Sequence, residues 1–272
     1  MLNLAHAFDF EGAAVRWGVM GDSSAPPLVL IHGTPFSAQV WRRIAPWLAR
    51  DRRVFYFDLL GYGLSQPGGP RDVSLGAQNK VLGALLDHWE LLKPEVLAHD
   101  FGGATALRAH LLDGRDFSRL TLVDPVAVRP WGSPFVTHVR EHEAAFAGMP
   151  DYAHAALLDA YVQTAAHRTL RAEDLAVHTA PWRGAVGQPA FYRQIAQMDQ
   201  AHTDAIEARL GEMRCPVRLL WGVEDQWIPL ETGRRVADLL APETVVEIPG
   251  AGHLVQEDAP EAILAIMAAP GR

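Results

Sequence analysis

The sequence is poor in cysteine, lacks an excess of positive charge and has no long apolar run. Cys215 is the only cysteine in 272 residues, which excludes an internal disulfide and a metal site built from several cysteines. A net charge of −8 disfavours binding to a phosphate backbone, so we expect no nucleic-acid partner. No run of about 18 apolar residues is present, so no transmembrane helix is predicted. Residues 1–15 do not resemble a signal peptide, because Asp9 and Glu11 interrupt the apolar residues. We therefore expect a cytoplasmic protein with no membrane partner.

The sequence does contain a regular alternation of apolar runs and helical patterns. With 49% hydrophobic residues, the chain can bury a large core as one domain, or as one domain with an insertion. Apolar runs typical of strands buried on both faces occur at 26–33, 52–63, 94–100, 118–124, 215–222 and 243–250. Helical spacing of apolar residues occurs at 37–50, 74–92 and 102–114. This alternation predicts an α/β fold with a mostly parallel sheet, and residues 11–21 predict an antiparallel strand at its edge.

The alternation is interrupted between Asp124 and Cys215. This stretch contains several prolines between short amphipathic helical patterns, and it shows no strand pattern. We interpret residues 126–212 as an inserted helical cap, or lid, domain, and residues 1–125 and 213–272 as the core domain. Such an insertion would lie over the carboxyl ends of the strands, where open α/β sheets bind ligands.

The segment VLAHDFGGATAL, residues 96–107, places Asp100 at a sharp turn between a strand and a helix. One interpretation is that Asp100 caps the helix, which is the most ordinary role of an aspartate there. The other is a nucleophile elbow, in which a strained turn exposes a reactive side chain and requires small neighbours. Ala98 and Gly102 occupy the small positions, so the pattern also fits an elbow that carries a carboxylate.

Three further motifs at strand ends fit a catalytic triad with an oxyanion hole. HGTP, residues 32–35, follows the first buried strand, and Thr34 is the candidate amide donor because Pro35 has no N–H. The amide of Phe101 would be the second donor. Asp225 follows the strand at 215–222 as the candidate acid, and His253 lies in a glycine-flanked loop after the last strand as the candidate base.

Together these motifs resemble the α/β-hydrolase fold family over the whole chain, through HGTP, DLLGYGLSQP, AHDFGG, WGVEDQWIP and GAGHLVQEDAP. The resemblance implies a mostly parallel eight-stranded sheet flanked by helices, with an inserted helical lid. Most members carry a serine nucleophile, whereas Asp100 resembles the branch of epoxide hydrolases, haloalkane dehalogenases and fluoroacetate dehalogenases. Some dehalogenases of this branch place the triad acid at the position of Asp124, which is the alternative to Asp225. We expect a small-molecule substrate, no cofactor or metal, and a monomer or homodimer.

The chemistry of a carboxylate nucleophile favours the same branch. Attack on an ester carbonyl would give a mixed anhydride, which is a poor intermediate. Attack of Asp100 on an sp³ carbon that bears a halide or an epoxide oxygen gives an ordinary alkyl ester. His253 would then activate the water that hydrolyses this ester, while Asp225 would orient the imidazole and stabilise its cationic form.

The sequence lacks the residues with which dehalogenases of this branch bind their substrates. Haloalkane dehalogenases hold the halide with a tryptophan after the nucleophile and an asparagine in the HG-x-P turn, or with a lid tryptophan. Here Phe101 and Thr34 occupy the first two positions, so Trp131 or Trp182 would have to supply a donor. Fluoroacetate dehalogenases have arginines where this sequence has Phe101 and Ala104.

The insertion resembles that of epoxide hydrolases, which protonate the epoxide oxygen with two lid tyrosines. PAFYRQ resembles the segment of the second tyrosine, which makes Tyr192 the candidate acid. The early part of the insertion contains Phe135 and His138 instead of a tyrosine, and His138 is a candidate helper. We therefore expect an epoxide hydrolase-like enzyme for a mostly apolar substrate, with haloalkane dehalogenase as the alternative and a non-enzymatic ligand binder as the remote one.

Overall fold

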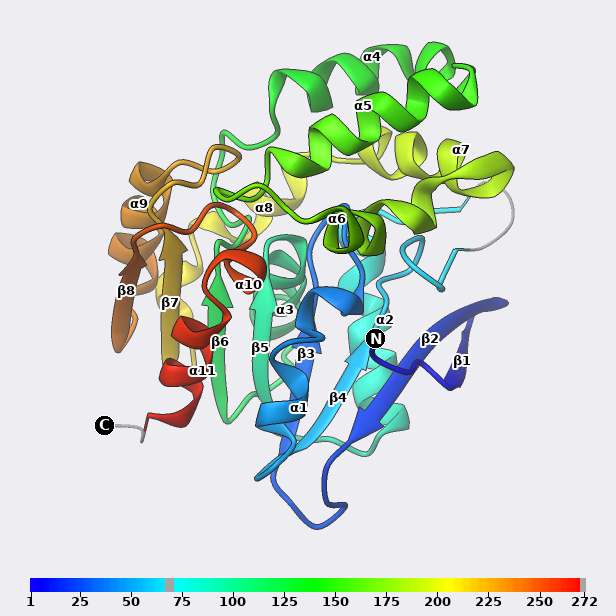
Figure 1. The fold of residues 1–272 in the computed structure, drawn as a ribbon. Helices are drawn as coiled ribbons and strands as arrows, with labels where there is room; N and C mark the ends of the chain where they lie inside the picture. Colours follow the sequence, from blue (N-terminus) through cyan, green and yellow to red (C-terminus); the bar gives the residue numbers. More distant parts are fainter. Residues whose placement is uncertain (67–70, 270–272) are drawn as a thin grey trace.

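The computed structural model describes residues 1–66 and 71–269, and it is built around an eight-stranded sheet (Figure 1). The strand order is β1-β2-β4-β3-β5-β6-β7-β8. Strands β1 and β2 pair antiparallel at one edge, while the other six run parallel. The strands are β1 His6–Phe10, β2 Ala13–Met20, β3 Pro27–Ile31, β4 Arg53–Phe57, β5 Glu95–His99, β6 Arg119–Val123, β7 Val217–Gly222 and β8 Thr244–Ile248. The expected eight-stranded, mostly parallel sheet is confirmed.

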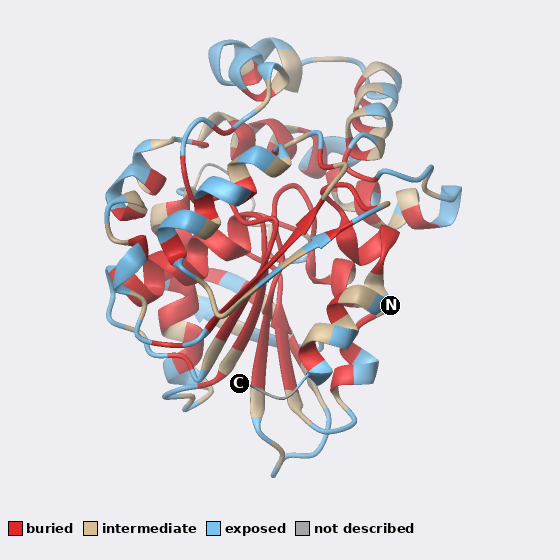
Figure 2. Ribbon diagram, turned by 90° about the vertical axis from the view of Figure 1, so that its left-hand side faces the viewer, coloured by how far each residue is buried: buried red, intermediate tan, exposed pale blue. Residues whose placement is uncertain are grey.

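The central strands are apolar and almost wholly buried, because helices cover both faces of the sheet (Figures 1 and 2). One face carries the short helix α1 (Ala45–Leu48) and helix α11 (Pro260–Ala268), and the other carries α2 (Leu75–His88) and α3 (Phe101–Leu111). Helix α9 (Leu230–Leu240) follows β7, and the short α10 (Val255–Asp258) follows β8.

The prediction of a single helix over residues 37–50 is wrong. The structure has a 3₁₀ helix, η1 (Ala38–Trp41), and then α1, with Pro46 in the first turn of α1. Proline has no N–H to donate to the preceding turn and its ring crowds that turn, so the helix restarts there instead of continuing.

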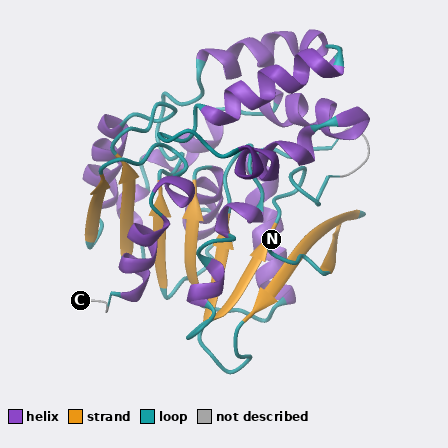
Figure 3. Cartoon of the chain, viewed as in Figure 1, coloured by secondary structure: helices purple, strands orange, loops and turns teal. Residues whose placement is uncertain are grey.

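Residues 126–212 form helices and no strand, and they lie beyond the carboxyl ends of the parallel strands (Figures 1 and 3). The elements are α4 Pro134–Ala147, α5 Asp151–Gln163, α6 Ala172–Thr179, η2 Ala180–Trp182, α7 Gly184–Ala196, α8 Ala201–Glu207 and, at the end, η3 Leu210–Glu212. This helical segment faces the strand ends that carry the candidate residues. No helix among the described residues is long and apolar enough to cross a membrane.

Candidate active site

Asp100 lies at the turn between β5 and α3 and has a backbone conformation that is rare for a residue with a side chain. Its φ is 50° and its ψ is −117°, and its side chain makes no capping hydrogen bond to the helix. A Cβ at Gly102 would lie 2.4 Å from the carbonyl oxygen of Ile31, so the elbow fits against β3 only with glycine there. The geometry is therefore that of a strained elbow and not that of a helix cap.

The carboxylate of Asp100 is held between the HGTP turn and His253. The amide of Thr34 donates to Oδ1 at 2.6 Å, and Oδ2 lies 3.4 Å from Nε2 of His253. Burial alone would raise the pKa of Asp100, but the hydrogen bonding and charge of His253, with the amide of Phe101, lower it. The amides of Thr34 and Phe101, the two donors predicted from the sequence, thus both act on the carboxylate of Asp100.

His253 is paired with Asp225. Its Nδ1 lies 2.8 Å from Oδ2 of Asp225, while Oδ1 of Asp225 accepts from the amides of Trp227 at 2.7 Å and Ile228 at 2.9 Å. Burial alone would lower the pKa of His253, but the carboxylates of Asp225 and Asp100 raise it well above its usual value. The indole of Trp227 stacks on the imidazole with ring centres 5.1 Å apart, so the ring is oriented from two sides.

Asp124 is close to this pair but does not bond to the imidazole. Its Oδ1 accepts from the amide of Gly222 at 2.8 Å, and its Oδ2 is buried without a partner among the described residues. Burial and the nearby Asp225 raise the pKa of Asp124 well above its usual value, which favours the neutral acid. Of the two acids that the sequence left open, the structure places Asp225 on His253.

A small cavity opens over Asp100. Its polar lining comes from Thr34, Asp100, Ser133 and Tyr161. The rest of the lining is apolar or aromatic, except for one glycine, and consists of Phe101, Val126, Trp131, Gly132, Val136, Met198, Trp227 and Ile228. A lining of this kind suits a small, mostly apolar molecule.

Tyr161 is the functional candidate that the sequence interpretation passed over. It projects from α5 into the cavity, and burial, followed by the charge of Asp100, raises the pKa of its phenol. Asp100 and Tyr161 are therefore within electrostatic reach of each other. Helical spacing could have identified Tyr161 from the sequence. It lies seven residues after His154 and three after Leu158, so the three share one face of α5, and the other two are buried.

Tyr192, expected as the acid, is not brought to the cavity. It is fully buried in α7, and its hydroxyl donates to Nδ1 of His154 at 2.8 Å. Nε2 of His154 in turn donates to the carbonyl of Trp182 at 2.9 Å, and burial lowers the pKa of His154, which favours the neutral ring that can accept from Tyr192. Tyr192 is thus engaged inside the helical segment.

Phe135 and His138 also lie outside the cavity lining. Phe135 packs against Tyr161 with ring centres 4.6 Å apart, so it supports a cavity residue from behind. His138 is exposed on α4 beside Glu141 and His142. The donor atoms of these three exposed side chains lie within 4.8 Å of one another and could hold a metal ion, but none of the three lines the cavity over Asp100.

The indole N–H groups near the site are bonded to protein atoms. Trp131 lines the cavity and donates to Oγ1 of Thr203 at 2.8 Å. Trp182, which does not line the cavity, donates to the carbonyl of Pro35 at 2.5 Å. Trp227 donates to Oγ1 of Thr164 at 2.9 Å. Each of the two tryptophans expected as halide donors therefore already has an acceptor.

Comparisons with known proteins agree with this architecture. A solved alpha/beta hydrolase fold protein from Burkholderia ambifaria is 58% identical, with a TM-score of 0.95 over 98% of each chain. The dihydrolipoyllysine-residue acetyltransferase component of the acetoin cleaving system of Pseudomonas putida is 27% identical over 93% of this chain, which spans only 65% of that relative. Haloalkane dehalogenase 2 of Mycobacterium tuberculosis is 25% identical over 94% of this chain and 91% of its own length. The alpha/beta hydrolase fold family matches residues 26–260. The expected resemblance is confirmed, and the chain belongs to the alpha/beta hydrolase fold family.

Proposed function

We propose that this chain hydrolyses a small, mostly apolar epoxide through an alkyl ester on Asp100. The observation that carries the proposal is the pairing of Asp100 with Tyr161 across one apolar cavity, in which an anionic nucleophile and a phenolic acid lie together. The helical segment 126–212 would act as the cap, because it supplies Tyr161 and much of the apolar lining.

The first step would open the epoxide ring. Oδ2 of Asp100 attacks a ring carbon while the carbon–oxygen bond to that carbon breaks, and the phenol of Tyr161 protonates the departing oxygen. The products are an Asp100 ester that carries a free hydroxyl and a Tyr161 phenolate. Thr34 keeps Oδ1 turned away from the substrate, because its amide donates to that oxygen, so the oxygen facing the catalytic base is the one that attacks.

The second step would hydrolyse the ester. His253 takes a proton from water as the water attacks Cγ of Asp100, and the amides of Thr34 and Phe101 stabilise the oxyanion. Collapse breaks the ester bond, and protonated His253 gives its proton to the leaving alkoxide, which completes the diol. The proton left on the Asp100 carboxylic acid restores the phenol of Tyr161, so the cycle consumes one epoxide and one water.

Formation of the ester removes the charge of Asp100, and this change lets His253 act as a base. In the free protein, Asp225 and Asp100 both raise the pKa of His253. Alkylation replaces the charge of Asp100 with a neutral ester, so this contribution disappears and the pKa of His253 falls. The imidazole becomes a base at the stage that needs one.

Haloalkane dehalogenase activity is the second candidate, because haloalkane dehalogenase 2 of Mycobacterium tuberculosis is among the relatives. Release of a halide needs donors that solvate a departing anion. Position 101 is phenylalanine, and the indoles of Trp131, Trp182 and Trp227 donate to protein acceptors. Among the described residues that line it, the cavity thus offers a phenol that can protonate an oxygen and no free indole N–H for a halide, which favours the epoxide.

Diol formation and halide release over a panel of small epoxides and haloalkanes test the proposal. We expect diols from neutral epoxides, and we expect Tyr161→Phe to lower their rate by roughly 10²-fold or more, the scale of a lost general acid. Tyr192→Phe is the matched control and should leave the rate of ring opening within about twofold, since its hydroxyl is bonded to His154. Halide release without any diol would contradict the epoxide and favour a dehalogenase.

A further inference from the structure

The loop that carries His253 is fastened to one stretch of the helical segment, residues 165–178. The amide of Leu254, next to His253, donates to the carbonyl of Ala165 at 2.9 Å. The carboxylate of Asp258 accepts from the amides of His167 at 2.8 Å and Arg168 at 3.0 Å. These bonds cross from the core to the connection between α5 and α6, so the catalytic histidine is positioned partly by the cap.

Asp258 joins both sides of this junction. Besides its two bonds to the helical segment, its Oδ2 accepts from the amide of Gly252 at 2.9 Å, immediately before His253. The side chain is only 3% exposed, and hydrogen bonds to a buried carboxylate are stronger than those between neutral groups. A Cβ at Gly252 would lie 2.8 Å from the amide nitrogen of His167, which shows how closely the two backbones approach.

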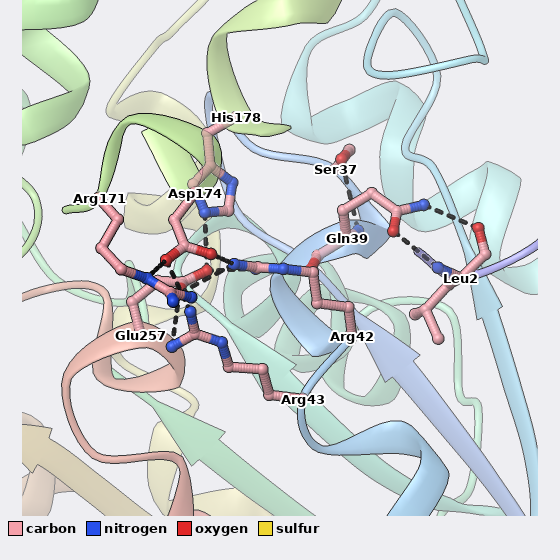
Figure 4. Close-up of polar contacts among 9 residues, drawn as sticks. All are labelled: Leu2, Ser37, Gln39, Arg42, Arg43, Arg171, Asp174, His178 and Glu257. Atoms are coloured by element: carbon pink, nitrogen blue, oxygen red, sulfur yellow. Dashed lines mark hydrogen bonds and ion pairs between the residues drawn. The ribbon is translucent and has the colours of Figure 1, made fainter. Parts of the chain in front are cut away.

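A buried ion-pair network joins α10, the turn that follows the His253 loop, to α6 and to Arg42 (Figure 4). Glu257 of α10 accepts from His178 of α6 at 2.8 Å and pairs with Arg42, which follows η1. Asp174 of α6 pairs with Arg42 at 2.5 Å and with Arg43 at 2.8 Å. The side chains of Arg42 and Asp174 are 10% and 9% exposed, and that of Glu257 is 1% exposed, so loss of one partner would leave a buried charge unpaired.

The nucleophile is positioned independently of this junction. Asp100 is set by the elbow between β5 and α3 and by the amide of Thr34. On the core side, the carbonyl of His253 accepts from Nε2 of His99 at 2.9 Å. Glu224 also holds the loop from the core, since its amide donates to the carbonyl of Ala251 at 3.0 Å and its carboxylate accepts from the amide of Gly250 at 2.8 Å. Asp258 and residues 165–178 of the helical segment give the loop its second support, at Gly252 and Leu254. The two halves of the reaction therefore rest on separate supports.

We propose that Asp258 is a positioning residue for His253, acting through the backbone of the 252–254 loop and the docked 165–178 stretch. The inference rests on the proposed two-step function. It requires that loss of the carboxylate slows hydrolysis of the Asp100 ester while alkylation of Asp100 continues. The reason is that an imidazole displaced by a fraction of an ångström no longer places water on Cγ, whereas attack by Asp100 needs no such alignment.

The test is single-turnover kinetics of Asp258→Asn with a neutral epoxide, followed by the mass of the alkyl-enzyme. We expect alkylation within about twofold of wild type and ester hydrolysis slower by roughly 10- to 100-fold, the scale of a misplaced catalytic group. Glu261→Gln, which changes an exposed carboxylate on α11, is the matched control and should change neither step. Equal slowing of both steps, or unchanged hydrolysis in the folded variant, would overturn the inference.

A second variant and an NMR measurement allow the test to succeed even if Asp258→Asn does not fold or if no substrate is found. Asp174→Asn weakens the junction from the helical segment only, and we expect it to slow hydrolysis by roughly three- to tenfold with alkylation unchanged. If Asp258→Asn does not fold, this variant decides. The NMR resonance of the His253 Nδ1–H proton should shift or broaden in Asp258→Asn and not in Glu261→Gln. If wild type forms no adduct with any electrophile, the two-step function fails, and this resonance still decides whether Asp258 positions His253.

Discussion

Asp100, Asp124 and Asp225 are three buried carboxyl groups in one site, and their hydrogen bonds give them different roles. Asp225 bonds to His253 and to two backbone amides. Asp100 accepts from Thr34 and faces the cavity. Asp124 accepts one amide bond, and burial together with Asp225 raises its pKa. The raised pKa favours the neutral form of Asp124, and we propose that Asp124 supports the strand end without taking part in proton transfer.

Replacement of each acid by asparagine tests this assignment. Asp225→Asn removes the charge that stabilises the imidazolium, so we expect ester hydrolysis to fall by roughly 10³-fold or more. Asp124→Asn replaces a neutral acid with a neutral amide of the same shape, so the rate should stay within about threefold. Single-turnover measurement of ester decay compares the two, and a larger loss in Asp124→Asn would reverse their roles.

The pH dependence follows from two opposite shifts. The pKa of Asp100 is lowered, so the nucleophile stays ionised as the pH falls. In the alkyl-enzyme Asp225 still raises the pKa of His253, so the base is lost by protonation on the acid side while free Asp100 is still ionised. We therefore expect the alkyl-enzyme to accumulate at about pH 5 and to decay rapidly at about pH 8.5, on either side of the usual histidine range. Rapid quenching followed by intact-mass measurement would detect the accumulated alkyl-enzyme. If alkylation is lost at a higher pH than ester decay as the pH is lowered, the two pKa shifts are refuted.

At the scale of elements, the strand-to-helix turn at Asp100 depends on a close approach between α3 and β3. Gly102 lies against the carbonyl of Ile31 at a distance that admits no side chain. Gly102→Ala should therefore destabilise the protein by about 1–3 kcal/mol, as overpacking does. Gly211→Ala is the control, because a Cβ there meets only the carbonyl of Leu239, at an ordinary 3.6 Å. Thermal unfolding compares the two, and equal melting temperatures would show that the elbow relaxes at no cost.

The strands were predictable from the sequence because each is a short apolar run that ends where the turn chemistry changes. The run at 94–100 became β5, and the run at 118–124 became β6. The helix at 37–50 was not predictable from apolar spacing alone, since that spacing continues across Pro46 while the backbone does not. Among the described residues, edge strand β1 pairs only with β2, and its exposed or partly buried residues show little apolar alternation.

At the scale of the whole molecule, the site lies where the helical segment meets the carboxyl ends of the strands. The residues at strand ends, such as Asp100 and Asp225, were predictable because the topology of a parallel sheet brings them to one edge. The sequence could not predict which tyrosine, Tyr161 or Tyr192, lines the cavity, because this depends on how α5 packs against α7. His154 accepts a hydrogen bond from the hydroxyl of Tyr192, which is 38 residues away in the sequence. No local sequence pattern predicts such a contact.

The charge of the cavity predicts which substrates are excluded. Among the described residues, its lining contains the anionic Asp100 and no lysine or arginine. A neutral epoxide should therefore be turned over with a kcat/KM at least roughly 10²-fold higher than an epoxide of the same size that carries a carboxylate, because the anion would be desolvated beside Asp100. Steady-state kinetics on the matched pair checks this, and comparable values would show a cationic subsite that the cavity lining does not reveal.

The most direct test of the two-step account follows oxygen through one turnover in H₂¹⁸O with excess wild-type enzyme. If Asp100 attacks carbon and water then attacks Cγ, the new hydroxyl oxygen of the first diol comes from Asp100. The diol is then unlabelled, and one ¹⁸O remains in the peptide that contains Asp100. If water attacks the substrate directly, the first diol carries ¹⁸O and the Asp100 peptide carries none, which would contradict the covalent mechanism.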